Sequence, residues 1–72
     1  MTEFPLYLYV YEPNGTYGKP SEIANAQELE TLMNTTINVA VHLGREVVIT
    51  DPLDFCVFHA KDGAVIFPVR YR

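Results

Sequence analysis

The chain has 72 residues, of which 49% are hydrophobic and 19% charged, and its formal net charge is −4. This composition excludes a disordered chain, and the acidic balance argues against a nucleic-acid partner, because clustered Lys and Arg deliver most of that affinity. No run of 18 or more apolar residues is present to span a bilayer, so we also expect no membrane partner.

The cysteine content and the first residues bear on the compartment and on stability. The single cysteine, Cys56, cannot form an internal disulfide, and the opening residues Met1-Thr2-Glu3 lack the basic start of a secretory signal. We therefore expect a cytoplasmic protein. A domain of this size buries only about 60% of the surface that its unfolded chain exposes, so self-association is a plausible source of further core.

The clearest predicted element is a strand over residues 4–11, in which aliphatic and aromatic side chains alternate. One face is expected in the core and carries Phe4, Leu6, Leu8 and Val10. The other face carries Tyr7, Tyr9 and Tyr11. Their hydroxyls need water or a partner, so these three tyrosines form the predicted interaction surface. The alternative is that they pack across strands beneath the loop over residues 13–24.

The segment after this strand is predicted to be a long loop. Asn14-Gly15 is typical of a tight turn, because both residues adopt positive φ readily. A short return strand through Thr16 and Tyr17 is the alternative, which the glycine and proline that follow disfavour.

A helix is predicted over residues 26–43. Asn25 and Glu28 form a capping box, in which the Asn25 side chain accepts from a first-turn amide and Glu28 reaches back to the Asn25 amide. Gly44 follows where a left-handed cap is needed. A strand over residues 37–43 is the alternative, because these residues are rich in β-branched side chains and also alternate. At 100° per residue one arc of the helix holds Leu29, Leu32, Met33, Thr36, Ile37, Val39, Ala40, Val41 and Leu43.

Three successive strands are predicted in the last third, over residues 46–50, 55–60 and 64–67. The turns between them are Asp51-Pro52-Leu53-Asp54 and Asp62-Gly63. The expected fold class is therefore α+β, within one domain spanning residues 1–72. One helix packs on a small, mainly antiparallel sheet of about four strands, in the order strand, helix, strand, strand, strand.

Apolar side chains exceed what one helix covers. Neither face of the strand over residues 55–60 is polar, and Val48 faces away from Val47 and Ile49. This excess favours burial against another chain, either a second copy or a different protein. The alternative is a monomer whose loop over residues 13–24 folds across the second face.

We predict no catalytic residues, no metal ligands and no cofactor. Cys56 and His59 are three apart on a strand and face opposite sides, so they do not share one metal ion. We expect Cys56 to be a small core residue and His59 to be partly buried. Asp51 and Asp54 lie a strand length from Asp62, so the three do not form a carboxylate pair, and such turn residues usually bond the local backbone.

These patterns favour a small non-catalytic protein that acts by binding protein, as a homodimer or with another chain. Two alternatives stay open. One is an accessory inhibitor, encoded by a phage or plasmid, that binds a host protein. The other is a small-ligand-binding protein or enzyme subunit whose pocket forms between two copies and uses His42, His59 or Asp51.

Overall fold

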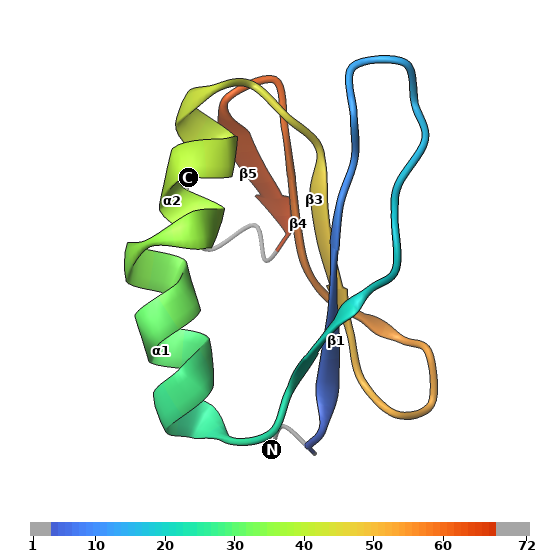
Figure 1. Cartoon of the computed structure of the whole chain (residues 1–72), viewed down its shortest axis with the longest axis vertical. Coiled ribbons are helices and arrows are strands. Elements are labelled where there is room, and N and C mark those ends of the chain that lie inside the picture. The colour runs from blue at the N-terminus through green and yellow to red at the C-terminus, as the bar shows by residue number, and fades with distance from the viewer. Residues whose placement is uncertain (1–3, 68–72) are drawn as a thin grey trace.

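The computed structural model describes residues 4–67, which form two layers (Figure 1). The strands are β1 (Leu6–Val10), β2 (Ser21–Ile23), β3 (Val47–Thr50), β4 (Cys56–Lys61) and β5 (Ala64–Phe67), and the helices are α1 (Ala26–Asn34) and α2 (Thr36–His42). The strands form one antiparallel sheet in the spatial order β2-β1-β3-β4-β5. Both helices lie on one face of this sheet. The predicted α+β class is confirmed.

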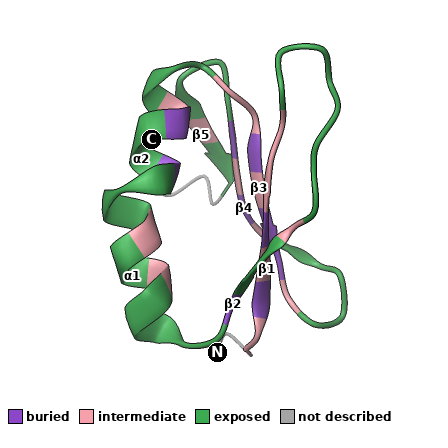
Figure 2. Cartoon of the chain, in the orientation of Figure 1, coloured by how far each residue is buried: buried purple, intermediate pink, exposed green. Residues whose placement is uncertain are grey.

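The core lies between the helices and the sheet, as the buried residues in Figure 2 show. Every second residue of β1 faces the helices, which explains the alternation in the sequence, and β3 contributes in the same way. The buried hydrophobic residues are Leu6, Leu8, Ile23, Ile37, Ala40, Val47, Ile49, Phe58 and Ala60.

The prediction of about four strands, with only one before the helix, is wrong, because β2 adds a fifth strand at the sheet edge. Its Ile23 pairs with Leu6 and is fully buried. A strand of three residues is too short to show a period, so burial of one side chain, and not a sequence pattern, defines it. The alternative return strand through Thr16 and Tyr17 is reduced to one bridge between Tyr11 and Tyr17.

The helical prediction is confirmed and the strand alternative over residues 37–43 is wrong. The capping box forms with one difference: Asn25 Oδ1 accepts from the Glu28 amide at 2.9 Å, whereas the Glu28 carboxylate accepts from the Ala24 amide at 2.8 Å. The predicted helix over residues 26–43 is present as α1 and α2, with an interruption of one residue at Thr35. Thr35 Oγ1 donates to the Thr31 carbonyl at 2.7 Å, and such back-bonding competes with regular helix geometry.

The apolar arc predicted on this helix is wider than the face that is buried. Ile37 and Ala40 are buried, but Val39 and Leu43 are 56% and 69% exposed. Ile37 and Val39 lie roughly 200° apart around α2, so only one of the two can face the sheet.

The predicted turns are confirmed. Gly44 has a φ of 75° after α2, and Gly15 has a φ of 88° after β1. Asp62 and Gly63 both have positive φ, 56° and 83°, as a two-residue hairpin turn requires. Within residues 4–67, no helix is long and apolar enough to cross a membrane.

Cys56 is exposed, so the prediction that it is a small core residue is wrong. Ile49 pairs with Phe58, whereas the next residue, Thr50, pairs with Cys56, so β4 holds one extra residue at this point. This bulge interrupts the alternation that places Phe58 in the core. His59, beyond the bulge, is half-buried as predicted.

Candidate interaction surface

The sheet face turned away from the helices carries the three tyrosines of the predicted interaction surface. Tyr9 pairs with Val48 of β3, Val48 pairs with His59 of β4, and His59 pairs with Phe67 of β5, so one row of side chains crosses the sheet. We call this surface the open face and define it by Tyr7, Tyr9, Tyr11, Val48, Thr50, His59 and Phe67. Thr50 is buried, whereas the others are half-buried or exposed.

A fourth tyrosine reaches the open face from the loop after β1. The Tyr17 ring lies 5.2 Å from the Tyr9 ring in a T-shaped contact and 5.0 Å from the Tyr11 ring. Tyr17 itself stays 50% exposed. The loop therefore covers part of the open face, at Tyr9 and Tyr11, and the aromatic contacts within residues 4–67 do not include Tyr7.

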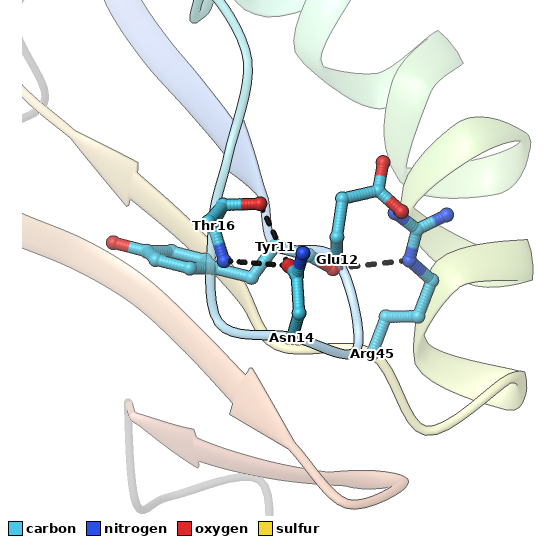
Figure 3. A network of polar contacts seen from close by, with 5 residues as sticks. All are labelled: Tyr11, Glu12, Asn14, Thr16 and Arg45. Carbon is cyan, nitrogen blue, oxygen red and sulfur yellow. Dashed lines mark hydrogen bonds and ion pairs between the residues drawn. The ribbon is translucent and has the colours of Figure 1, made fainter.

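A polar network fixes the base of this loop (Figure 3). Arg45 Nε donates to the Tyr11 carbonyl at 3.0 Å, and its Nη2 pairs with Glu12 Oε1 at 2.8 Å. Asn14 Oδ1 accepts from the amide and the hydroxyl of Thr16, at 3.0 and 2.7 Å. The Tyr11 ring points away from Arg45. The network thus holds the loop from one side while leaving the ring on the open face.

A pocket of about 240 Å³ lies among these rings. We call it the tyrosine pocket, and its lining residues are Tyr9, Tyr11, Tyr17, Val48, Thr50 and Asp54. Asp54 comes from the turn between β3 and β4, where Asp51 Oδ1 accepts from the amides of Leu53 and Phe55, both at 2.9 Å. The Asp54 amide donates to the Asp51 carbonyl at 2.9 Å. Asp51 therefore serves the turn, as predicted, and the turn holds Asp54 beside the rings.

One contact between ionisable side chains lies on the open face. His59 Nε2 lies 2.8 Å from Glu46 Oε2, and both side chains are about one-third exposed. Burial raises the pKa of the Tyr11 hydroxyl, and Tyr17, Glu46 and Tyr9 raise it further. The Tyr11 hydroxyl is therefore protonated at neutral pH and available as a hydrogen-bond donor.

Two of the residues considered for chemistry, Cys56 and His42, have local partners. The Cys56 thiol donates to the Phe58 carbonyl at 3.4 Å, and His42 Nδ1 lies 3.1 Å from the Asn38 carbonyl oxygen. Asp62 lies in the turn between β4 and β5, a strand length from Asp51. Within residues 4–67, no three His, Cys, Asp or Glu side chains gather in a way that could hold a metal ion.

A second apolar region lies on the helical side. Val39 of α2 and Leu43, which follows α2, line a hollow of about 590 Å³ together with Val10. Its other lining residues are Thr35, Thr36, Ala40 and Arg45. This region is the natural comparison for the open face in any binding experiment.

Sequence reasoning places Tyr7, Tyr9 and Tyr11 on one face but misses the tyrosine pocket. Asp54 enters through the turn held by Asp51, and its positive φ of 71° is not evident from its neighbours. Comparison with protein-family models, with curated proteins and with solved structures finds no match to this chain. The described residues thus define a small two-layer α+β fold with one sheet face that its helices leave uncovered.

Proposed function

We propose that the chain is a small, non-catalytic, cytoplasmic protein-interaction module that acts as a homodimer through its open face. One observation carries this proposal: α1 and α2 lie on one side of the sheet, whereas the open face on the other side is covered in part by the loop after β1, which contacts it through Tyr17. Tyrosine and phenylalanine are enriched at protein interfaces, because they offer large rigid areas at low entropic cost.

The size of the open face supports a second copy as the occupant. The molecule measures 28 × 28 × 21 Å, and its shortest axis runs across the strands (Figure 1). The projected area of the open face is therefore roughly 600 Å², and the uneven surface of the side chains adds to it. A standard interface buries about 800 Å² per partner. Leu53 and Phe55, in the turn between β3 and β4, are also 72% and 65% exposed.

The charge distribution also supports pairing of like faces. The ionisable side chain at the centre of the open face is His59, and Glu46 lies against it at 2.8 Å. Two copies can meet there without opposing two unpaired like charges, which would be costly in a desolvated interface. Face-to-face packing of aligned sheets about a two-fold axis is a common arrangement.

Sedimentation equilibrium tests the proposal. We expect the unaltered chain to sediment at twice its 8.2 kDa mass, and the Tyr7→Ser/Tyr9→Ser variant to sediment as a monomer. The matched control is Val39→Ser/Leu43→Ser, which removes exposed apolar area from the helical side. This variant should remain a dimer. Circular dichroism establishes that each variant is folded. A monomeric unaltered chain, or a dimer lost only in the control, contradicts the proposal.

A further inference from the structure

The tyrosine pocket has the composition of a cation site. Its walls are three aromatic rings, whose faces carry negative electrostatic potential, and Asp54 adds a carboxylate. Among residues 4–67, no Lys or Arg lines it. Within residues 4–67, the Asp54 carboxylate makes no hydrogen bond or ion pair, although its backbone is fixed by the Asp51 turn.

The size of the pocket favours one small cationic group. Its volume of about 240 Å³ is below the roughly 300–1,000 Å³ of pockets for drug-sized ligands, so a single side-chain group suits it. A guanidinium stacks on aromatic faces, pairs with carboxylates through two hydrogen bonds and is less strongly hydrated than an ammonium. We infer that the tyrosine pocket binds a guanidinium group, and that the Arg70-Tyr71-Arg72 segment of a second copy supplies it.

This inference rests on the proposed homodimer, and charge complementarity supports the choice of segment. Arg45 is the only arginine within residues 4–67, and it is already bound to Glu12 and to the Tyr11 carbonyl. The other two arginines of the chain, Arg70 and Arg72, lie beyond the described residues. They bring positive charge to a chain whose net charge is −4.

The sheet topology shows how a second copy would deliver this segment. β5 runs from Ala64, opposite Lys61, to Phe67, opposite His59, and so heads toward the end of the sheet that holds the Asp54 turn. A two-fold axis parallel to the strands, between β3 and β4, lays β5 of one copy over β1 of the other. This axis keeps the Asp54 turns of both copies at the same end of the dimer. Phe67, the last residue of β5, is level with Tyr9 across the sheet and would then lie over the partner's tyrosine pocket.

Charge-removing variants test the contact. We expect Asp54→Asn and Arg70→Gln/Arg72→Gln each to weaken dimerisation about tenfold in sedimentation equilibrium, and their combination to weaken it little further. The matched controls are Asp62→Asn, in the opposite turn, and Lys19→Gln/Lys61→Gln. Equal weakening by the controls would mean that general electrostatics govern the dimer, which contradicts the inference.

Mixing the variants tests whether the contact joins two copies. A heterodimer of Asp54→Asn with Arg70→Gln/Arg72→Gln regains one complete site and should form in excess over either variant homodimer. If the heterodimer and the two homodimers form in the proportions expected for random pairing, the segment binds its own chain or does not bind. That result overturns the inference.

The outcomes separate this inference from the proposed function. A stable dimer that is indifferent to Asp54→Asn leaves the homodimer standing and removes the guanidinium contact. If the unaltered chain is a monomer at every concentration, the homodimer itself has failed. The pocket is then probed in the Arg70→Gln/Arg72→Gln variant with N-acetylarginine amide, and with N-acetylcitrulline amide as the neutral control. Chemical-shift changes at Tyr17 and Thr50 with the arginine compound alone support a guanidinium site, and none with either compound overturns it.

Discussion

The two faces of the sheet are built from the same strands but are completed differently. In β3, Val47 and Ile49 face the helices and are buried, whereas Val48 between them lies on the open face and is half-buried. The helical side receives Ile37 and Ala40 from α2, while the open face receives mainly Tyr17. The alternation of a strand thus shows that two faces exist, but the remainder of the chain determines which one is covered.

The largest expected difference separates Ile49→Ala from Val48→Ala. Removing the buried Ile49 side chain should lower the free energy of unfolding by about 2–5 kcal/mol, because a cavity remains in the core. The half-buried Val48 should cost about 1 kcal/mol. Urea denaturation at one fixed protein concentration measures both.

A chain of this size has only several kcal/mol of total stability, so Ile49→Ala can leave too little folded protein to measure. Ile49→Val then serves in its place, with an expected loss of about 0.5–1.5 kcal/mol. Equal losses in Ile49→Ala and Val48→Ala would mean that both faces are covered alike within one chain.

The next test concerns the contact that Tyr17 makes with the open face. Tyr17→Ala should lower the free energy of unfolding by about 1–2 kcal/mol through the loss of two ring contacts. Amide exchange in residues 12–18 should accelerate as the loop loosens. Leu53→Ala removes an exposed side chain from another turn and is the control. If both variants lose the same stability, Tyr17 does not hold the loop.

A smaller effect is expected from the ion pair on the open face. Glu46→Gln should cost about 0–1 kcal/mol, because the pair with His59 is partly exposed, and 1 M NaCl should reduce the difference. Glu12→Gln, which breaks the more exposed pair with Arg45, is the matched comparison. If the free energy of unfolding of the isolated monomer falls by well above 2 kcal/mol, water is excluded from this pair even without a partner.

The smallest effect concerns the pH dependence of stability. Because folding raises the pKa of Tyr11 above 10.0, folding favours its protonated form. The corresponding stabilisation is complete below pH 10 and is lost as pH rises through the folded pKa. Ultraviolet titration of tyrosinate should show one late ionisation that Tyr11→Phe removes. A Tyr11 whose pKa is not raised above its usual value would contradict the packing around its ring.

The parts of the fold that follow from sequence are those with a strong local signal. The alternation around Tyr7 and Tyr9, the cap at Asn25 and the turn at Asp62-Gly63 each correspond to one local geometry. The positions that depend on distant contacts do not follow. β2 exists because Ile23 completes the core, and Cys56 is exposed because β4 is bulged opposite Thr50.

The candidate site divides in the same way. Tyr7, Tyr9 and Tyr11 share a face because residues two apart on a strand point the same way. The tyrosine pocket needs the return of Tyr17 and the turn that holds Asp54, and neither has a periodic signal. Local patterns therefore predict which side chains share a surface, whereas its depth and charge depend on the loops around it.

The most direct test of the central claim is an isotope-filtered nuclear Overhauser experiment on a mixture of labelled and unlabelled chain. The account predicts contacts between copies that involve Tyr7, Tyr9 and Phe67 of the open face. The account is contradicted if the contacts between copies instead involve Val39 and Leu43 on the helical side. It is also contradicted if no contact between copies appears at any concentration.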